Sequence, residues 1–230
     1  MRAMTQEAIR RIFAATAATQ ARFVAEHLDA LAKVIDITID ALAAGRTLYF
    51  FGNGGSAADA QHLAAEFVNR YRLERAPLPA IALTTDSSAL TSIANDFGYA
   101  AIFTKQIQAL ARRGDVAFAL STSGRAENVL AAVDECRRRG VVTVGLTGGI
   151  GGALASRVDH LLCVDGTTET PRIQETHIVI GHALCELVEI GLAERQRTAR
   201  NPAPLASGVS RIAGRSARMA RATAKRRRRT

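Results

Sequence analysis

Two polar segments of the chain combine residue types that bind phosphate groups. Each directly follows a short apolar run and precedes a helical pattern, and the segments are Gly52-Asn53-Gly54-Gly55-Ser56 and Ser121-Thr122-Ser123-Gly124. Hydroxyl groups donate hydrogen bonds to phosphate oxygens, glycine lets the backbone approach closely, and a following helix directs its unpaired N–H groups at the anion. One such segment alone would be an ordinary capped turn. Two of them, each after an expected parallel strand, favour a phosphate-binding site.

Four side chains on two expected helices could bind a metal ion or transfer protons. His62 and Glu66 stand four residues apart and therefore share one helix face. On the last expected helix, Gln174 and His182 lie about 80° apart around the axis and can converge, whereas His177 lies about 140° from His182. Two imidazoles, a carboxylate and an amide oxygen are donors that zinc accepts. By residue type alone, a surface salt bridge is the commoner role of a His and Glu at this spacing.

The elements that carry these residues alternate between helices and short strands. Residues 5–44 show a helical period of apolar positions and predict one long or two consecutive N-terminal helices. Five short apolar runs follow, each expected to be a strand, at residues 47–51, 79–83, 116–120, 141–146 and 160–164. Runs that are apolar throughout indicate a parallel sheet with helices on both faces, and such a sheet binds ligands at the carboxyl ends of its strands. The prediction is an α/β three-layer sandwich with both phosphate-type segments at that edge.

The charge of the chain is unevenly distributed. The formal net charge is +9 at pH 7, but residues 201–230 contain eight Arg, one Lys and no acidic residue. The first 200 residues are therefore electrically balanced, and nothing in their composition indicates a specific nucleic-acid partner. The last residues combine Pro, Gly and small side chains with an Arg-rich end, which is typical of a disordered extension. We predict a domain over residues 1–195 and a basic tail over residues 196–230.

Length, hydropathy and cysteine content bound the remaining possibilities. The 230 residues suffice for one large core or two small ones. No apolar run reaches the roughly 18 residues of a membrane span, and the N-terminus lacks the layout of a signal peptide, so we expect a cytoplasmic protein without a membrane contact. The three cysteines Cys136, Cys163 and Cys185 show no CxxC spacing, which argues against a zinc cluster or a disulfide framework.

Four separated motifs occur in a specific order, and the resemblance that they carry covers roughly residues 5 to 192. They are Phe51-Gly52-Asn53-Gly54-Gly55-Ser56, Asn95-Asp96-Phe97-Gly98-Tyr99, Ser121-Thr122-Ser123-Gly124, and Arg172-Ile173-Gln174-Glu175 with His182. Together they resemble the sugar isomerase (SIS) domain of the phosphoheptose isomerase family. The resemblance implies a flavodoxin-like fold and the conversion of sedoheptulose 7-phosphate to D-glycero-D-manno-heptose 7-phosphate, the first step of bacterial heptose synthesis. It also implies a homotetramer with active sites at subunit contacts, and a zinc ion held by His62, Glu66, Gln174 and His182.

Chemistry and resemblance together give these residues roles in an aldose–ketose isomerisation. One group must remove a proton beside a carbonyl and another must protonate the resulting enediol, and we assign Glu66 as the base and His182 as the acid. The phosphate would be held by Ser56, Ser121, Thr122 and Ser123, with Asn53, Gly54, Gly55, Glu66 and Gln174 as further substrate contacts. Asn95 and Asp96, expected in a loop ended by Gly98, would contact the sugar hydroxyls, although an Asx-type turn explains them equally well.

Two stretches depart from the family pattern. Ala126 stands where the family commonly has a further serine, and it is preceded by Arg125. One phosphate hydroxyl is therefore missing, and Arg125 could replace it with charge or favour a different phosphosugar. Residues 167–171 also differ from the pattern, which leaves the sugar specificity open.

Three alternative classes fit the sequence less well. A non-catalytic SIS scaffold that binds a replication initiator has no need of His62, Glu66 and His182 together. A sugar-phosphate-sensing regulator would carry a helix-turn-helix domain, but residues 1–45 lack its basic surface and its turn. A dinucleotide enzyme is suggested by the glycines at 52 and 54, yet Asp86 follows them by about 30 residues instead of the usual 20.

Overall fold

The computed structural model describes residues 1–200, with side chains described to residue 198. The chain divides into two compact units, Met1–Ala193 and Glu194–Thr230, and the fold and site below belong to the first. The elements are α1 (Arg2–Ala43), β1 (Leu48–Gly52), α2 (Gly55–Val68), β2 (Ala80–Ala82), α3 (Ser87–Phe97), η1 (Tyr99–Ala101), α4 (Ile102–Leu110), β3 (Val116–Leu120), α5 (Glu127–Arg139), β4 (Val142–Gly148), η2 (Gly152–Leu154), β5 (His160–Val164) and α6 (Thr170–Arg200). The predicted domain boundary at residue 195 falls within α6 and stays a prediction. Of the predicted tail, residues 196–200 continue α6, and residues 201–230 lie outside the described part of the chain.

The five strands form one parallel sheet in the order β2-β1-β3-β4-β5. β1 and β3 are neighbours with Leu48 opposite Val116 and Gly52 opposite Leu120, so the two strands end at the same level. The predicted runs at 116–120 and 160–164 coincide with β3 and β5, and the other three strands differ from their predictions by one or two residues at each end. The five-stranded parallel sheet is confirmed.

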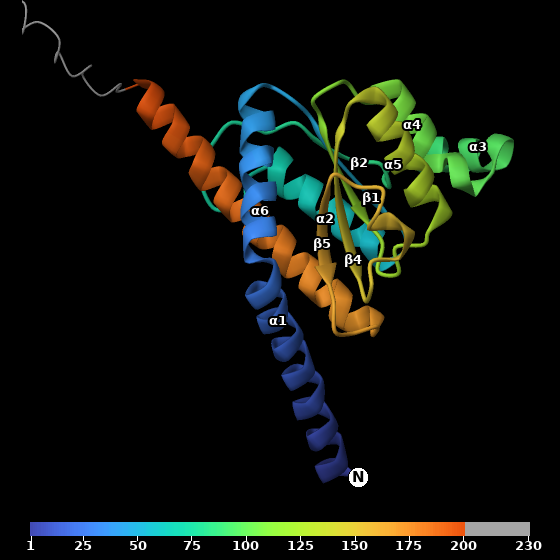
Figure 1. The fold of residues 1–230 in the computed structure, drawn as a ribbon, viewed down its shortest axis with the longest axis vertical. Helices are drawn as coiled ribbons and strands as arrows, with labels where there is room; N and C mark the ends of the chain where they lie inside the picture. Colours follow the sequence, from blue (N-terminus) through green and yellow to red (C-terminus); the bar gives the residue numbers. More distant parts are fainter. Residues whose placement is uncertain (201–230) are drawn as a thin grey trace, which may run out of the picture. The chain divides into compact units, whose positions relative to one another are not determined.

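Helices cover both faces of the sheet, as predicted for strands that are apolar throughout (Figure 1). One core joins α1, α2 and α6 to side chains such as Phe50, Phe118 and Leu146. The other joins α4 and α5 to the alternate side chains of the same strands, including Phe51 and Ala119, with part of α3 packed against it. The α/β three-layer sandwich is therefore confirmed, and its period-2 strand pattern divides the apolar residues between two cores.

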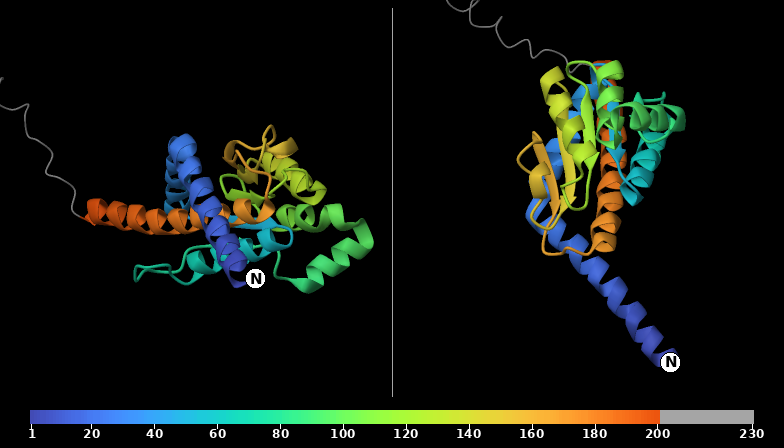
Figure 2. Two further views of the ribbon diagram at one scale, coloured as in Figure 1. Left: turned by 90° about the horizontal axis from the view of Figure 1, so that it is seen from below. Right: turned by 90° about the vertical axis from the view of Figure 1, so that its right-hand side faces the viewer.

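The predicted N-terminal helical region is the single 42-residue helix α1. Its first buried residue is Phe23, and the turns before it extend away from the sheet (Figure 2). Apolar side chains on these turns are exposed, among them Ile9 at 50 % and Phe13 at 73 %. Arg172 at the start of α6 donates hydrogen bonds to the carbonyl oxygen of Ile12 and to Thr16 Oγ1, both at 2.7 Å. The apolar side chains of these early turns thus face outward.

Among the described helices, α6 alone is long and apolar enough to cross a bilayer. Its most apolar window has a mean hydropathy of 1.4, and 50 % of that window is buried within the protein. The buried part lies against the sheet beside α1 and α2, as expected of a core helix.

Candidate active site

The two phosphate-type turns lie side by side, because each follows one of two adjacent strands. β1 leads outward to β2 and β3 leads outward to β4, so the strand order reverses between β1 and β3. A crevice opens at such a switch point, at the carboxyl ends of the strands. Here it is a cleft of about 350 Å³ lined by all seven predicted residues of the turns, which are Asn53, Gly54, Gly55, Ser56, Ser121, Thr122 and Ser123. Its size and hydroxyl lining suit a phosphate group.

A reciprocal pair of amide hydrogen bonds joins the two turns. Asn53 Nδ2 donates to Asn128 Oδ1 and Asn128 Nδ2 donates to Asn53 Oδ1, each at 2.8 Å. Tyr99 Oη also donates to Asn53 Oδ1 at 3.0 Å. Asn128 is buried in the first turn of α5. Asn53 therefore fixes the shape of the cleft. The sequence analysis predicted Asn53 only as a substrate contact and did not predict this structural role.

Close packing explains two of the glycines. A side chain at Gly55 would place its Cβ 2.5 Å from Gln174 Nε2, so it would displace this amide from its position beside the start of α2. Gly124 has φ +62°, and a Cβ there would overlap the carbonyl oxygen of Gly151. Only glycine adopts this conformation in so crowded a position.

Arg125 and Ala126 occupy different clefts. Ala126 lines the phosphate-type cleft, where it contributes no hydroxyl. Arg125 is exposed and lines a neighbouring cleft of about 230 Å³ that shares Thr122, Ser123 and Thr170 with the first. Arg125 thus lines the cleft that borders the glycine-rich segment after β4, and not the phosphate-type cleft.

Three of the four predicted metal ligands come together where α2 meets α6. His62 Nε2 lies 3.2 Å from His182 Nε2 and 3.3 Å from Glu66 Oε1. Gly181 allows this contact, because a Cβ at that position would overlap Leu63 on α2. Glu66 is half-buried and His62 is exposed. The predicted i, i+4 pair is therefore formed, and the second histidine is added to it by helix packing.

Gln174 and His177 lie elsewhere on α6. Gln174 lines the phosphate-type cleft and faces Gly55, two turns before the level of His182. His177 is fully buried, and its Nε2 lies 3.1 Å from the carbonyl oxygen of Thr147. Burial lowers the pKa of His177 to about 4, although the bond to Thr147 acts in the opposite direction. His177 is thus a neutral core residue, and it lies apart from His182, as its angular position predicted.

Asp59 belongs to the same site, although the sequence analysis did not select it. It precedes His62 by three residues and so shares its helix face. Burial raises the pKa of Asp59, while positive charge at His62 and His182 acts to lower it. Its Oδ2 atom is buried without a hydrogen-bond partner among the described residues. The helical spacing alone could have identified this carboxyl group.

A buried glutamate organises the segment that follows α2. Glu189 accepts hydrogen bonds from the backbone N–H groups of Tyr71, Arg72 and Leu73 at 2.7 to 2.9 Å and from Arg75 Nε at 2.8 Å. Burial acts to raise the pKa of Glu189, but these donors outweigh it and lower the pKa. The Tyr71 ring stacks on His182 with 5.6 Å between centroids. Glu189 therefore positions the ring that packs against the predicted acid.

Asn95 and Asp96 lie in α3 and not in the predicted loop. Asp86 caps this helix by accepting a hydrogen bond from the Ala89 N–H, and the helix continues to Phe97 before Gly98 ends it. Both side chains are exposed, and Asn95 Nδ2 donates to Asp96 Oδ1 at 2.8 Å. The expected loop was wrong because the capping aspartate starts a helix that the final glycine only terminates.

The donor set around His62 fits zinc. Two imidazole nitrogens and a carboxylate oxygen are ligands of the kind found at catalytic zinc sites. The two Nε2 atoms, 3.2 Å apart, have about the spacing of two ligands of one tetrahedral ion, roughly 3.3 Å. The same contact is also compatible with a hydrogen bond between the two rings in the metal-free protein.

Comparisons with known proteins identify the family of the chain. Residues 12–148 match the SIS domain family. A phosphoheptose isomerase of Solidesulfovibrio magneticus is 52 % identical and covers 83 % of this chain and 94 % of its own, and one of Aquifex aeolicus is 46 % identical with 82 % and 98 % covered. The structure of the Neisseria gonorrhoeae phosphoheptose isomerase aligns with a TM-score of 0.76 at 38 % identity, covering 81 % of this chain and 99 % of that one. The chain belongs to the phosphoheptose isomerase family of SIS-domain enzymes.

Proposed function

We propose that this protein interconverts sedoheptulose 7-phosphate and D-glycero-D-manno-heptose 7-phosphate, the first reaction of bacterial heptose synthesis. The observation that carries the proposal is the separation between the two halves of the site. Gly55 lines the cleft and His62 follows it by two turns of α2, or about 10 Å along the axis. A heptulose 7-phosphate has its phosphate and its carbonyl near opposite ends of a seven-carbon chain. Such a substrate can occupy the cleft with one end and reach His62, Glu66 and His182 with the other.

The residues supply the proton transfers of an enediol mechanism. Glu66 removes a proton from C1 of the ketose while His182 protonates the C2 oxygen, which gives the enediol. Glu66 then delivers its proton to C2 as His182 takes the proton of the C1 hydroxyl, which gives the aldose. The hydroxyl groups of Ser56, Ser121, Thr122 and Ser123 bind the remote phosphate, and this binding energy holds C1 and C2 against Glu66.

A zinc ion, one per subunit, belongs to the proposal. His62, Glu66 and His182 would hold it, whereas Gln174, the fourth predicted ligand, lines the phosphate-type cleft two turns before His182. When bound, zinc would polarise the carbonyl oxygen and stabilise negative charge on it. Because the imidazoles must be neutral to bind, a chelator or mild acid should remove the metal and lower activity, and added zinc should restore it. Full activity in protein that elemental analysis shows to be metal-free would contradict the zinc site.

Assembly and location complete the proposal. We infer a cytoplasmic homotetramer with active sites at subunit contacts, and neither a membrane nor a specific nucleic acid as partner. The exposed apolar side chains on the early turns of α1, including Ile9, Ile12 and Phe13, support self-association, because contiguous exposed apolar surface marks interfaces. Mass measurement in solution tests the tetramer directly.

The reaction is tested by incubating the protein with sedoheptulose 7-phosphate and following the aldose product. Fructose 6-phosphate and ribulose 5-phosphate serve as competing substrates, because Ala126 in the cleft and Arg125 beside it could alter the preferred phosphosugar. Preferred turnover of the heptulose supports the proposal. Turnover of a shorter sugar alone would support an isomerase activity but reject the heptose assignment. No turnover of any phosphosugar would reject the isomerase activity and favour a protein that only binds phosphosugars.

A further inference from the structure

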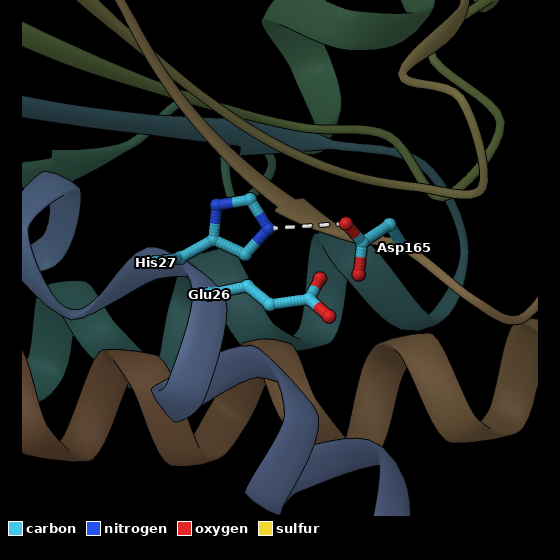
Figure 3. A group of neighbouring side chains, drawn as sticks. All are labelled: Glu26, His27 and Asp165. Carbon is cyan, nitrogen blue, oxygen red and sulfur yellow. Dashed lines mark hydrogen bonds and ion pairs between the residues drawn. The ribbon is translucent and has the colours of Figure 1, made fainter.

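A second group of metal-ligating side chains lies outside the active site. Glu26 and His27 are on α1, and Asp165 directly follows β5. One ligand atom from each of the three lies within 4.8 Å of the other two, and the side chains point toward one another (Figure 3). None of the three lines the phosphate-type cleft or contacts His62, Glu66 or His182 through a described bond.

Packing holds two of these side chains in place. The His27 ring stacks on Phe23, with 5.2 Å between centroids, and Phe23 is buried in the core beneath α1. His27 Nε2 lies 3.4 Å from Asp165 Oδ2, which is at the long limit of a hydrogen bond. The side chains of His27 and Asp165 are 22 % and 37 % exposed. A ring that is fixed from below, with a partly buried carboxylate beside it, has lost much of the freedom that ligand binding would cost.

The second oxygen of Asp165 is the atom that requires a partner. Asp165 Oδ1 is shielded from solvent and accepts no hydrogen bond from the described residues. Figure 3 shows this oxygen on the side of the carboxylate of Glu26. A buried carboxylate oxygen without a donor is costly, and a second carboxylate beside it adds repulsion. A cation between the two carboxylates removes both costs.

We propose that Glu26, His27 and Asp165 bind a divalent transition-metal ion of the zinc type. One imidazole nitrogen and two carboxylate oxygens are donors that such ions accept, and three protein ligands leave a coordination position for water. The ion would link α1 to the end of β5, two segments 138 residues apart in sequence. Its role is therefore structural, because binding to the folded state alone stabilises that state.

The test uses chelator-treated full-length protein and zinc as the probe. Zinc is titrated by calorimetry into wild type, Asp165→Asn, His27→Gln and the control Asp134→Asn, and the metal-dependent rise in Tm is measured for each. Asp134 is a suitable control because it is a surface carboxylate paired with Arg157 at 2.6 Å. We expect Asp165→Asn and His27→Gln each to bind one zinc fewer than wild type and to show a smaller rise in Tm. Both should retain wild-type turnover, since neither residue belongs to the catalytic group.

A second background separates this site from the proposed catalytic zinc. In His182→Gln protein the catalytic site is impaired, and we expect one zinc per chain to remain and to disappear when Asp165→Asn is added. A zinc stoichiometry and Tm rise in Asp165→Asn and His27→Gln equal to those of wild type would overturn the inference and leave an ion pair between His27 and Asp165. Loss of zinc in His182→Gln with none remaining would overturn it as well. If zinc binding depends on Asp165 but not on His182, the proposed catalytic zinc is rejected and the Asp165-dependent site stands.

Discussion

Glu66 is the residue on which the proposed chemistry depends most directly. It is half-buried on α2, and its carboxylate faces His62 at 3.3 Å, while His62 in turn faces His182. The three groups thus form a chain, and the proposed mechanism uses its two ends as proton acceptor and proton donor. An amide in place of the carboxylate keeps the shape of this chain and removes the base.

Glu66→Gln should therefore lower turnover by about two to four orders of magnitude, the usual contribution of general acid–base catalysis. The variant should remain folded by circular dichroism. Glu74→Gln is the matched control, because Glu74 is an exposed glutamate paired with Arg70, and it should behave as wild type. Wild-type turnover in Glu66→Gln would remove Glu66 from the mechanism.

His177 gives the fold a dependence on pH. Its pKa is about 4 in the folded protein, and the ordinary value near 6.5 applies to the unfolded chain. Between these values the unfolded state binds more protons, so the stability that is present above pH 6.5 is lost as the pH falls toward 4. The loss is about 3 kcal/mol for a shift of this size.

His177→Met removes the titrating group while keeping a side chain of similar length. Urea denaturation at pH 7, 5.5 and 4.5 should show a smaller decrease in the free energy of unfolding for the variant than for wild type. The variant will be less stable at pH 7, because the bond to the Thr147 carbonyl is lost. An equal pH dependence in both proteins would show that His177 does not control it.

The site residues that sequence analysis selected are those whose partners lie close in sequence or in a recognisable motif. His62 and Glu66 follow from helical spacing, and the hydroxyl turns follow from their position after apolar runs. Sequence analysis did not select Asn128 or Glu189, because their hydrogen-bond partners lie 75 and at least 114 residues away in the sequence. An asparagine or glutamate in an amphipathic helix carries no sign of such a partner until the chain has folded.

At the scale of elements, the segment between α2 and β2 has no regular structure and depends on α6 for its shape. Glu189 binds three consecutive backbone N–H groups, from Tyr71 to Leu73, and Arg75. Arg75 also donates to the carbonyl oxygens of Glu66 and Phe67 at 2.9 Å. The glutamate and arginine thereby connect α6, this segment and the end of the helix that carries the predicted base.

Glu189→Gln should destabilise the fold by about 3 kcal/mol, because a buried arginine and several N–H groups lose a charged acceptor. Turnover should also fall, since Tyr71 would no longer be held against His182. Glu186→Gln is the matched control on the same helix. Glu186 pairs with Arg72 on the surface at 2.7 Å and should contribute less than 1 kcal/mol. Equal Tm values for the two variants would contradict this assignment.

The strands and helices were predictable to different degrees. Strand runs that are apolar throughout identified all five strands, because both faces of a covered sheet must be buried. The order of the strands did not follow from the runs, since it depends on crossover connections that leave no local pattern. The end of α3 was expected to be a loop, because none of the residues of α3 is fully buried and its apolar side chains Leu90, Ile93 and Ala94 are only partly buried against the core.

At the scale of the whole molecule, the basic tail is predicted to be separate from the enzyme. Residues 201–230 lie outside the described part of the chain, and every predicted site residue precedes residue 192. Truncation after Arg200 should leave turnover and the mass of the assembly unchanged. It should also abolish weak, salt-sensitive retention on heparin, because nine positive charges are removed. Loss of activity or of assembly would place the tail inside the folded unit.

The exposed early turns of α1 allow subunit association to be measured by hydrogen exchange along this one helix. An isolated helix in water frays, so backbone amides before Ile12, where Arg172 binds the helix, will exchange with deuterium rapidly in the separate chain. A subunit that packs on Ile9 and Phe13 slows the exchange, whereas the amides near Val34, already buried within one chain, stay slow in either state. Diluting the protein should thus produce a gradient of exchange rates along a single helix, with its fast end before Ile12, and the concentration at which it appears measures how tightly the subunits hold one another.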